Sequence, residues 1–282
     1  MNVAIQNDFL KATFSTLGAE LISLISNSRE YIWQANPAIW GKHSPVLFPI
    51  IGTLKDDTYF HNGQPYHLPR HGFAREKTFE ITEHVADKIV FTLKDDTETL
   101  KVYPFQFELK IVYVLVQNSL EVRFEVHNTS NCDLYFSLGG HPGFALPNSF
   151  ENYSLVFEPE TNLYFSLLEQ NLLCQNTQVL ETENNKCPLH YSLFEKDALV
   201  FRNHKIQSIA IQENGANYLK VHFEQFPDLG IWTKTNAPFI CIEPWFGHAD
   251  EVSSTQILKD KAGMQTLAQA EVFQSKYSIE IF

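Results

Sequence analysis

Residues 107–126 read FELKIVYVLVQNSLEVRFEV, and this stretch determines the fold class. Apolar residues occupy every second position from Phe107 to Leu115 and again from Leu120 to Val126. The polar triplet Gln117-Asn118-Ser119 separates the two runs. Alternation with a period of two is typical of β-strands, so the stretch predicts an antiparallel hairpin with one apolar and one polar face.

Shorter runs of the same kind recur along the chain, at residues 9–15, 20–26, 88–93, 154–158, 162–168, 198–201, 208–212, 218–224, 239–242 and 277–281. A helical period is rare: Asp260–Ala270 predicts a short helix and Asn36–Trp40 a single turn. Many strands with few short helices indicate an all-β protein, a large antiparallel β-sandwich. No Gly/Ser/Pro-rich linker divides the chain, so we expect residues 1–282 to form a single domain.

The composition excludes several classes of protein. The 282 residues include 21 Lys+Arg and 33 Asp+Glu, and the formal net charge is −12. So acidic a chain lacks the basic surface that nucleic-acid binding needs. With 23 Phe, 11 Tyr and 4 Trp, the chain can bury enough apolar surface to fold, and these flat side chains suit a thick sandwich core.

The sequence also indicates a compartment. Its first residues form neither a basic segment nor an apolar one, so we expect no signal peptide. No window is long and apolar enough for a membrane span. Cys132, Cys174, Cys187 and Cys241 are widely spaced and form no Cys-x-x-Cys pair. We therefore expect a cytoplasmic protein with reduced cysteines and no membrane contact.

Three segments interrupt the alternation and combine polar groups with Gly, Pro and aromatic residues. They are residues 68–75 (LPRHGFAR), 137–144 (SLGGHPGF) and 239–248 (FICIEPWFGH). Their composition does not resemble that of core strands, so we interpret them as loops that carry the functional groups.

Glu243 is the first candidate within these segments. It follows four largely apolar residues and precedes Pro-Trp-Phe, so we expect its carboxylate to be partly desolvated. Desolvation raises a Glu pKa above its ordinary value of about 4.3, towards the range in which a general base works well. The alternative is a structural Glu that pairs with an Arg at a strand end.

His141 and His71 are the next candidates. His141 stands between Gly-Gly and Pro-Gly, and His71 lies between Arg70 and Gly72-Phe73. Glycines permit sharp turns and close approach of a ligand, although a lone His is more often structural. The two His with Glu243 also make a conceivable metal triad, but no close pairing such as His-x-His supports it, and we expect no metal.

Other catalytic patterns are absent from the sequence. No Gly-x-Ser-x-Gly elbow anchors a Ser/His/Asp triad, and no glycine-rich nucleotide-binding loop occurs.

Taken in order, the three segments resemble the aldose 1-epimerase (galactose mutarotase) family, in particular its branch of shorter bacterial proteins associated with lactose operons. The matching motifs are residues 71–75 (HGFAR), 140–144 (GHPGF) and 241–245 (CIEPW). Residues 45–49, 196–199 and 230–233 add supporting matches, and the resemblance extends over nearly the whole chain.

This resemblance implies a galactose mutarotase-like β-supersandwich that exchanges the α and β anomers of free aldohexoses. It implies Glu243 as general base, His141 as general acid and His71 as a second active-site histidine. It further implies sugar binding by Asp197, and we expect Trp232, Trp245 and Phe246 to offer apolar faces to the sugar. The reaction needs no cofactor. The expected partner is a small aldose, and the chain is expected to be a monomer or a homodimer.

One departure from the family pattern bears on substrate choice. The family often has an Arg after the Phe-Pro segment, where this chain reads Ile50-Ile51-Gly52-Thr53, and Arg75 is a candidate replacement. Three alternatives stay open. They are a hexose-6-phosphate mutarotase that binds phosphate through Lys42, Arg70 or Arg75, a carbohydrate-binding protein without turnover, and a glycoside hydrolase or lyase that pairs Glu243 with Asp197.

Overall fold

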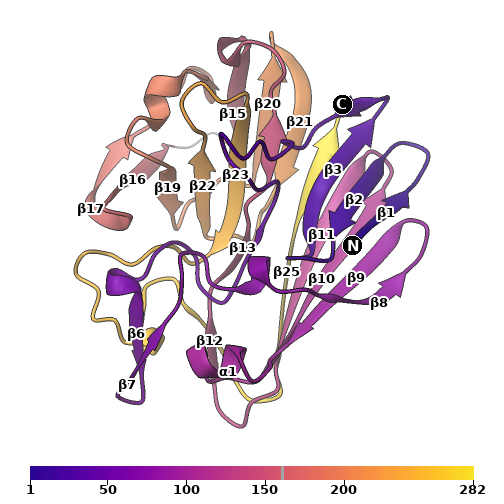
Figure 1. Ribbon diagram of the computed structural model, residues 1–282. Helices are drawn as coiled ribbons and strands as arrows, with labels where there is room; N and C mark the ends of the chain where they lie inside the picture. Colours follow the sequence, from indigo (N-terminus) through magenta and orange to yellow (C-terminus); the bar gives the residue numbers. More distant parts are fainter. Residues whose placement is uncertain (160–161) are drawn as a thin grey trace.

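The computed structural model describes residues 1–159 and 162–282, and within these ranges antiparallel strands dominate (Figure 1). The hairpin at residues 107–126 is confirmed: β10 (Phe107–Val116) pairs with β11 (Ser119–Asn128), and Tyr113 lies opposite Val122. Odd-numbered residues of β10 are buried and most even-numbered ones are not, as period-two alternation requires.

This hairpin lies within the largest sheet. Its nine described strands run in the order β18 (Lys186–Pro188), β15 (Tyr153–Glu158), β20 (Ser208–Glu213), β21 (Ala216–His222), β25 (Val272–Ile281), β11, β10, β9 (Lys88–Lys94) and β8 (Glu80–His84). Adjacent strands of this sheet pair antiparallel. The two faces of such a sheet can differ in polarity, and here one face is buried.

A second sheet carries the functional residues. Its order is β17 (Leu172–Val179), β16 (Tyr164–Glu169), β19 (Leu199–Arg202), β22 (Asp228–Trp232), β23 (Phe239–Phe246), β13 (Leu138–Gly140) and β5 (Val46–Leu47), with β14 (Gly143–Ala145) also beside β23. Ile240 and Ile242 of β23 share one hydrophobic cluster with Leu109 and Ile111 of β10, so the two sheets enclose a common core. This is the predicted β-sandwich.

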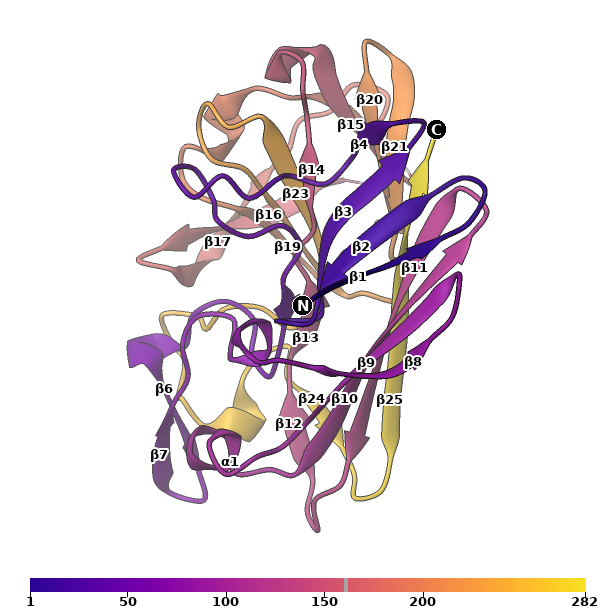
Figure 2. The same cartoon turned by 45° about the vertical axis from the view of Figure 1, so that its right-hand side comes forward.

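Smaller sheets complete the molecule (Figure 2). They are β1 (Asn2–Gln6), β2 (Lys11–Ser15), β3 (Glu20–Ser26) and β4 (Arg29–Glu30) in one sheet, β6 (Thr58–His61) with β7 (Gln64–His67), and β12 (Leu134–Phe136) with β24 (Gln265–Leu267). Phe14 of β2 packs 4.3 Å from the ring of Tyr113, so the first of these sheets covers part of the apolar face of the nine-stranded sheet.

Helices are few and short, as predicted. In the described ranges they are α1 (Thr99–Val102) and the 3-10 turns η1 (Lys55–Asp57), η2 (Ala74–Glu76), η3 (Phe150–Asn152), η4 (Tyr191–Phe194) and η5 (Leu258–Asp260). No helix in these ranges is long and apolar enough to cross a membrane. The predicted helix at Asp260–Ala270 is wrong, because η5 ends at Asp260 and Gln265–Leu267 instead pairs with β12.

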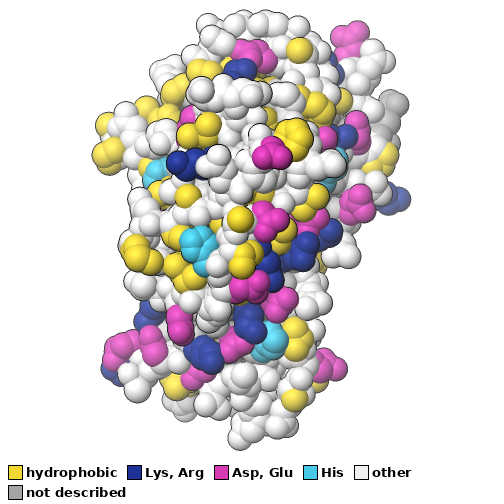
Figure 3. All heavy atoms as spheres, turned by 90° about the vertical axis from the view of Figure 1, so that its right-hand side faces the viewer, with side chains coloured by type: hydrophobic (Ala, Val, Ile, Leu, Met, Phe, Trp, Pro, Cys, Tyr) yellow, Lys and Arg dark blue, Asp and Glu magenta, His cyan; other side chains and the backbone are white. Residues whose placement is uncertain are grey.

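The surface carries mixed charge. On the face shown in Figure 3, Lys and Arg side chains alternate with Asp and Glu and do not gather into one basic patch. Glu121 of β11 illustrates this, because its carboxylate contacts both Arg123 and Lys276. Each of the four cysteines, all within the described part of the chain, is a free thiol.

Candidate active site

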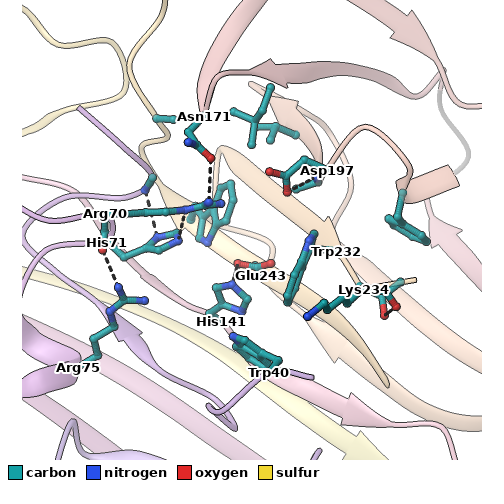
Figure 4. A pocket seen from close by; sticks show the side chains of 18 of the residues that line it. Trp40, Arg70, His71, Arg75, His141, Asn171, Asp197, Trp232, Lys234 and Glu243 are labelled. Atoms are coloured by element: carbon teal, nitrogen blue, oxygen red, sulfur yellow. Dashed lines mark hydrogen bonds and ion pairs between the residues drawn. The ribbon is translucent and has the colours of Figure 1, made fainter. Parts of the chain in front are cut away.

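A cavity of about 510 Å³ opens on the eight-stranded sheet (Figure 4). Seven of the eight site residues predicted from the sequence line it: His71, Arg75, His141, Asp197, Trp232, Glu243 and Trp245. The fold therefore brings together residues that are up to 174 positions apart in the chain, between His71 and Trp245.

Glu243 projects into the cavity from the middle of β23, opposite Gly230 of β22. We interpreted the segment around Glu243 as a loop, but it is a strand that is buried on both faces. Strands buried on both faces do not alternate between apolar and polar residues. Residues of odd number, Glu243 and Trp245, face the cavity, whereas Phe246 joins the main core.

The prediction that Phe246 lines the sugar site is therefore wrong. Its ring packs 4.6 Å from Phe226 and 5.0 Å from Phe273. Successive side chains of a strand point to opposite faces, so Phe246 and Glu243 cannot share one side of β23.

His141 reaches Glu243 because it lies between two short strands that both run along β23 in one register. Gly139 of β13 pairs with Trp245, and Gly143 of β14 pairs with Cys241. This register places the intervening His141 opposite Glu243, and the amide of His141 donates to the carbonyl of Pro45. Side chains of residues directly opposite each other on antiparallel strands are neighbours, so the pairing itself brings the two groups together.

The two side chains make a close contact. Nε2 of His141 lies 3.1 Å from Oε2 of Glu243. Burial, with a smaller contribution from the charges of Arg70 and Arg75, lowers the pKa of His141 to about 3. Burial also raises the pKa of Glu243 well above its ordinary value, with Arg70 opposing the rise. Both effects favour uncharged forms, as expected for groups withdrawn from water.

His71 is held by the backbone of Gly52. The amide of His71 donates to the Gly52 carbonyl at 2.9 Å, and the Gly52 amide donates to Nδ1 of His71 at 3.1 Å. Burial lowers the pKa of His71 well below its ordinary value, so the ring is neutral. Because Nδ1 accepts the Gly52 amide, the ring proton lies on Nε2.

Arg70 also contacts Nε2 of His71. Its Nε, also a donor, lies 3.2 Å from Nε2 of His71. A neutral imidazole cannot accept a hydrogen bond at both nitrogens. The contact with the exposed Arg70 is therefore the weaker one, and a hydroxyl oxygen placed there would accept from both groups.

Asp197 and His71 each have a strained backbone conformation. Their φ angles are +80° and +69°, in the left-handed region that residues with side chains rarely adopt. Asp197 lies between η4 and β19, and its Oδ1 accepts the amide of Ala198. Asn171, which also lines the cavity, has the same conformation with a φ of +66°.

Aromatic residues form one wall of the cavity. The indole of Trp40 stacks on the ring of His141 at 5.0 Å, and Trp232 meets the same ring edge-on at 6.0 Å. Trp40 was not among the predicted site residues. Gly143 makes room for it, because a Cβ there would lie 2.7 Å from the Trp40 indole. Trp245 forms part of the floor.

Three basic residues, Arg70, Arg75 and Lys234, line the cavity. Nη1 of Arg70 donates to Oδ1 of Asn171, a cavity-lining residue of the β16–β17 turn that the sequence did not indicate. Arg75 donates to the Arg70 carbonyl and does not reach His71. Lys234 also lines the cavity, whereas Lys42, a predicted phosphate ligand, pairs with Glu76 and is not among the lining residues.

One group in the described part of the chain offers donor atoms for a metal. Atoms of His141, Cys241 and Glu243 lie within 4.8 Å of one another. Burial raises the pKa of the Cys241 thiol well above its ordinary value, and the charge of Glu243 adds to this. A metal here would have to displace the thiol proton, since the thiolate is the ligand form.

The fold and the site define a class of protein: galactose mutarotase-like β-sandwiches with a His/Glu pair in a cavity on one sheet. The structure superimposes with a TM-score of 0.95 on the galactose mutarotase related enzyme from Lactobacillus acidophilus, at 37% identity over 100% of this chain and 97% of that one. A galactose mutarotase-like protein from Lactobacillus casei ATCC 334 matches with a TM-score of 0.94 and 28% identity over the full length of both chains.

The sequence comparisons give the family. Residues 1–260 match the family model described as aldose 1-epimerase, and the chain belongs to this family. It is also 35% identical over 298 aligned residues to the plasmid-encoded protein LacX of Lactococcus lactis subsp. lactis, with 100% of this chain and 99% of the relative covered. The resemblance seen in the sequence motifs is thus confirmed.

Proposed function

We propose that this protein is an aldose 1-epimerase, an isomerase that interconverts the α and β anomers of free aldohexoses. The observation that carries the proposal is the 3.1 Å contact between His141 and Glu243 in a sugar-sized cavity. Membership of the aldose 1-epimerase family supports the same reaction class.

The pair suits ring opening. The Glu243 carboxylate takes the proton from the C1 hydroxyl, and the His141 imidazolium gives a proton to the ring oxygen. The C1–O5 bond breaks, the C1–O1 bond becomes a carbonyl, and the open aldehyde rotates about C1–C2. Reclosure on the other face returns both protons. No electron or group is transferred, so this chemistry requires no cofactor.

One proton shared by the pair is enough for the whole cycle. Carboxylate with imidazolium and carboxylic acid with neutral imidazole contain the same number of protons. The first form opens the ring and becomes the second form. The pKa shifts favour the second, uncharged form, so burial stabilises the state that follows ring opening.

The remaining residues suit sugar binding. Nε2–H of His71 and the carboxylate of Asp197 can hold hydroxyl groups, and Trp40 and Trp232 offer apolar faces to the C–H surface of the ring. Arg70 stands nearer than Arg75 to the reacting pair, so Arg70 is the better candidate for the role of the family arginine that is missing near Thr53.

A hexose 6-phosphate mutarotase is the second candidate, because Arg70, Arg75 and Lys234 line the cavity and can hold a phosphate. NMR exchange at the anomeric carbon, with glucose, galactose and glucose 6-phosphate as substrates, separates the two. Faster anomer exchange of the free sugars supports the first proposal, and exchange of the phosphate alone supports the second. Tight sugar binding without exchange would indicate a binding protein.

A further inference from the structure

A buried ion pair lies behind the cavity wall, outside the residues that line it. Nζ of Lys261 contacts Oδ1 of Asp250 at 2.9 Å and the carbonyl of His248 at 2.6 Å. The two side chains are only 4% and 3% exposed. Withdrawing two charges from water is costly, and an ion pair of this kind contributes little net stability. Its position is therefore worth explaining.

Asp250 joins segments that are far apart in the sequence. Its amide donates to the carbonyl of Thr53 at 2.9 Å, and its Oδ2 accepts the amide of Lys55 at 3.0 Å. Its carbonyl accepts the amide of Leu173, two residues after Asn171 at the cavity mouth. Lys261 holds the one carboxylate oxygen that Lys55 does not use, and so fixes the orientation of the carboxylate.

The segment that Asp250 holds ends at Gly52, which lines the cavity. A Cβ on Gly52 would lie 2.5 Å from Cβ of Ala249, so the two backbones pack in direct contact. Gly52 makes two hydrogen bonds with His71, one of which determines which ring nitrogen carries the proton. A continuous series of contacts thus runs from Lys261 through Asp250 and Gly52 to the imidazole of His71.

We propose that Lys261 and Asp250 are positioning residues for the active site: they hold residues 52–55 against Ala249 and thereby fix the orientation and tautomer of His71. Neither residue touches the substrate. The catalytic consequence of this inference rests on the proposed epimerase function, whereas the effect on the His71 ring does not.

The test compares two variants of Lys261 with a matched control elsewhere in the chain. Lys261→Met removes the charge and keeps the length of the side chain, and Lys261→Arg keeps the charge. The matched control is Arg202→Met, which breaks the 2.6 Å pair between Arg202 and Glu251. Glu251 is the neighbour of Asp250, but its carboxylate contacts β19 and not the Gly52 segment. All measurements are made at a temperature at which circular dichroism shows each variant folded.

Two readouts are needed. In Lys261→Met we expect kcat/KM for anomer exchange to fall by about 10-fold to 100-fold, as misplacement of active-site groups does. Lys261→Arg should recover most of this loss, and Arg202→Met should stay within about twofold of the wild type, as for a partly exposed pair. In ¹H–¹⁵N spectra of the histidine rings, assigned with His71→Gln, the His71 signals should shift in Lys261→Met alone.

A folded Lys261→Met variant with wild-type kcat/KM and unchanged His71 signals would overturn the proposal. If that variant does not fold, Asp250→Asn, which keeps the shape of the side chain, is measured against the same two outcomes. If the wild-type protein exchanges no aldose, the proposed function fails, and the His71 signals still decide whether Lys261 positions the ring.

Discussion

His141 and Glu243 meet at 3.1 Å between Nε2 and Oε2, and the two residues are only 8% and 1% exposed. In the described part of the chain, Nδ1 of His141 and Oε2 of Glu243 have no well-aligned hydrogen-bond partner. Unmet hydrogen-bonding capacity at buried atoms is costly, and a substrate with several hydroxyl groups can satisfy it. In the proposed reaction, hydroxyl groups of the sugar would lie beside this acid and base.

Glu243→Gln should lower the rate of mutarotation by at least about 100-fold, the lower end for a positioned acid or base. The amide keeps the shape of the side chain but cannot take the proton of the C1 hydroxyl. Polarimetry with freshly dissolved α-glucose measures the rate. Glu251→Gln, the same change outside the cavity, is the control and should retain the wild-type rate. A wild-type rate in Glu243→Gln would eliminate the proposed base.

The pH profile of kcat/KM should be bell-shaped, with its acid limb well below the ordinary imidazole pKa of about 6.5. Adding a second proton to the pair removes the base, and removing the last proton removes the acid. Because burial lowers the pKa of His141 to about 3 and raises that of Glu243, the one-proton form extends over a wide pH range. Initial rates at constant ionic strength test this, and an acid limb centred near 6.5 would contradict it.

Arg70→Met should move both limbs of that profile to higher pH. The positive charge of Arg70 opposes proton binding, and it lowers the pKa of both Glu243 and His141. Without it, each group retains its proton to a higher pH. Arg70 is exposed to solvent, so we expect a shift of a fraction of a pH unit.

Arg70→Lys is the matched control for this change, because it keeps the charge but loses the planar guanidinium that contacts Asn171. Its limbs should stay where the wild type has them, even if KM changes. The electrostatic role of Arg70 is wrong if Arg70→Met and Arg70→Lys give the same pH profile.

The sandwich could be predicted from the sequence because most of its strands have one buried face. Apolar and polar residues then alternate along the strand, as in β10 and β11. The same signal finds only residues 239–242 of β23, because this strand is buried on both faces, and the segment 239–248 as a whole was interpreted as a loop. The predicted helix at Asp260–Ala270 failed for another reason: pairing with β12 over Gln265–Leu267 overrides local propensity.

The site was only partly accessible to sequence reasoning. Glycines and a proline mark the break between the two short strands at His141, and the apolar surroundings of Glu243 indicate desolvation. Asn171 lies in an ordinary hairpin turn, and Trp40 lies far from the motifs, so tertiary contacts alone bring them to the cavity. Phe246 could have been excluded, had β23 been recognised, by its opposite parity to Glu243.

Gly230→Ala tests how the cavity floor is built. Gly230 lies opposite Glu243, and a Cβ there would come within 2.4 Å of the Trp245 indole. The ring must move, and overpacking of this kind typically costs about 1–3 kcal/mol of stability. Because Trp245 lines the cavity while Glu243 and His141 keep their own contacts, we expect KM to rise more than kcat falls.

Gly41→Ala is the control for this substitution. Its new Cβ would lie 3.7 Å from the nearest atom, an ordinary contact, so stability and KM should both stay close to wild type. Thermal unfolding gives the first quantity and initial rates at several sugar concentrations give the second. A rigid Trp245 indole cannot accommodate a new atom at 2.4 Å without moving. If Gly230→Ala were as stable as Gly41→Ala and bound sugar equally well, Trp245 would therefore not form a rigid floor of the cavity.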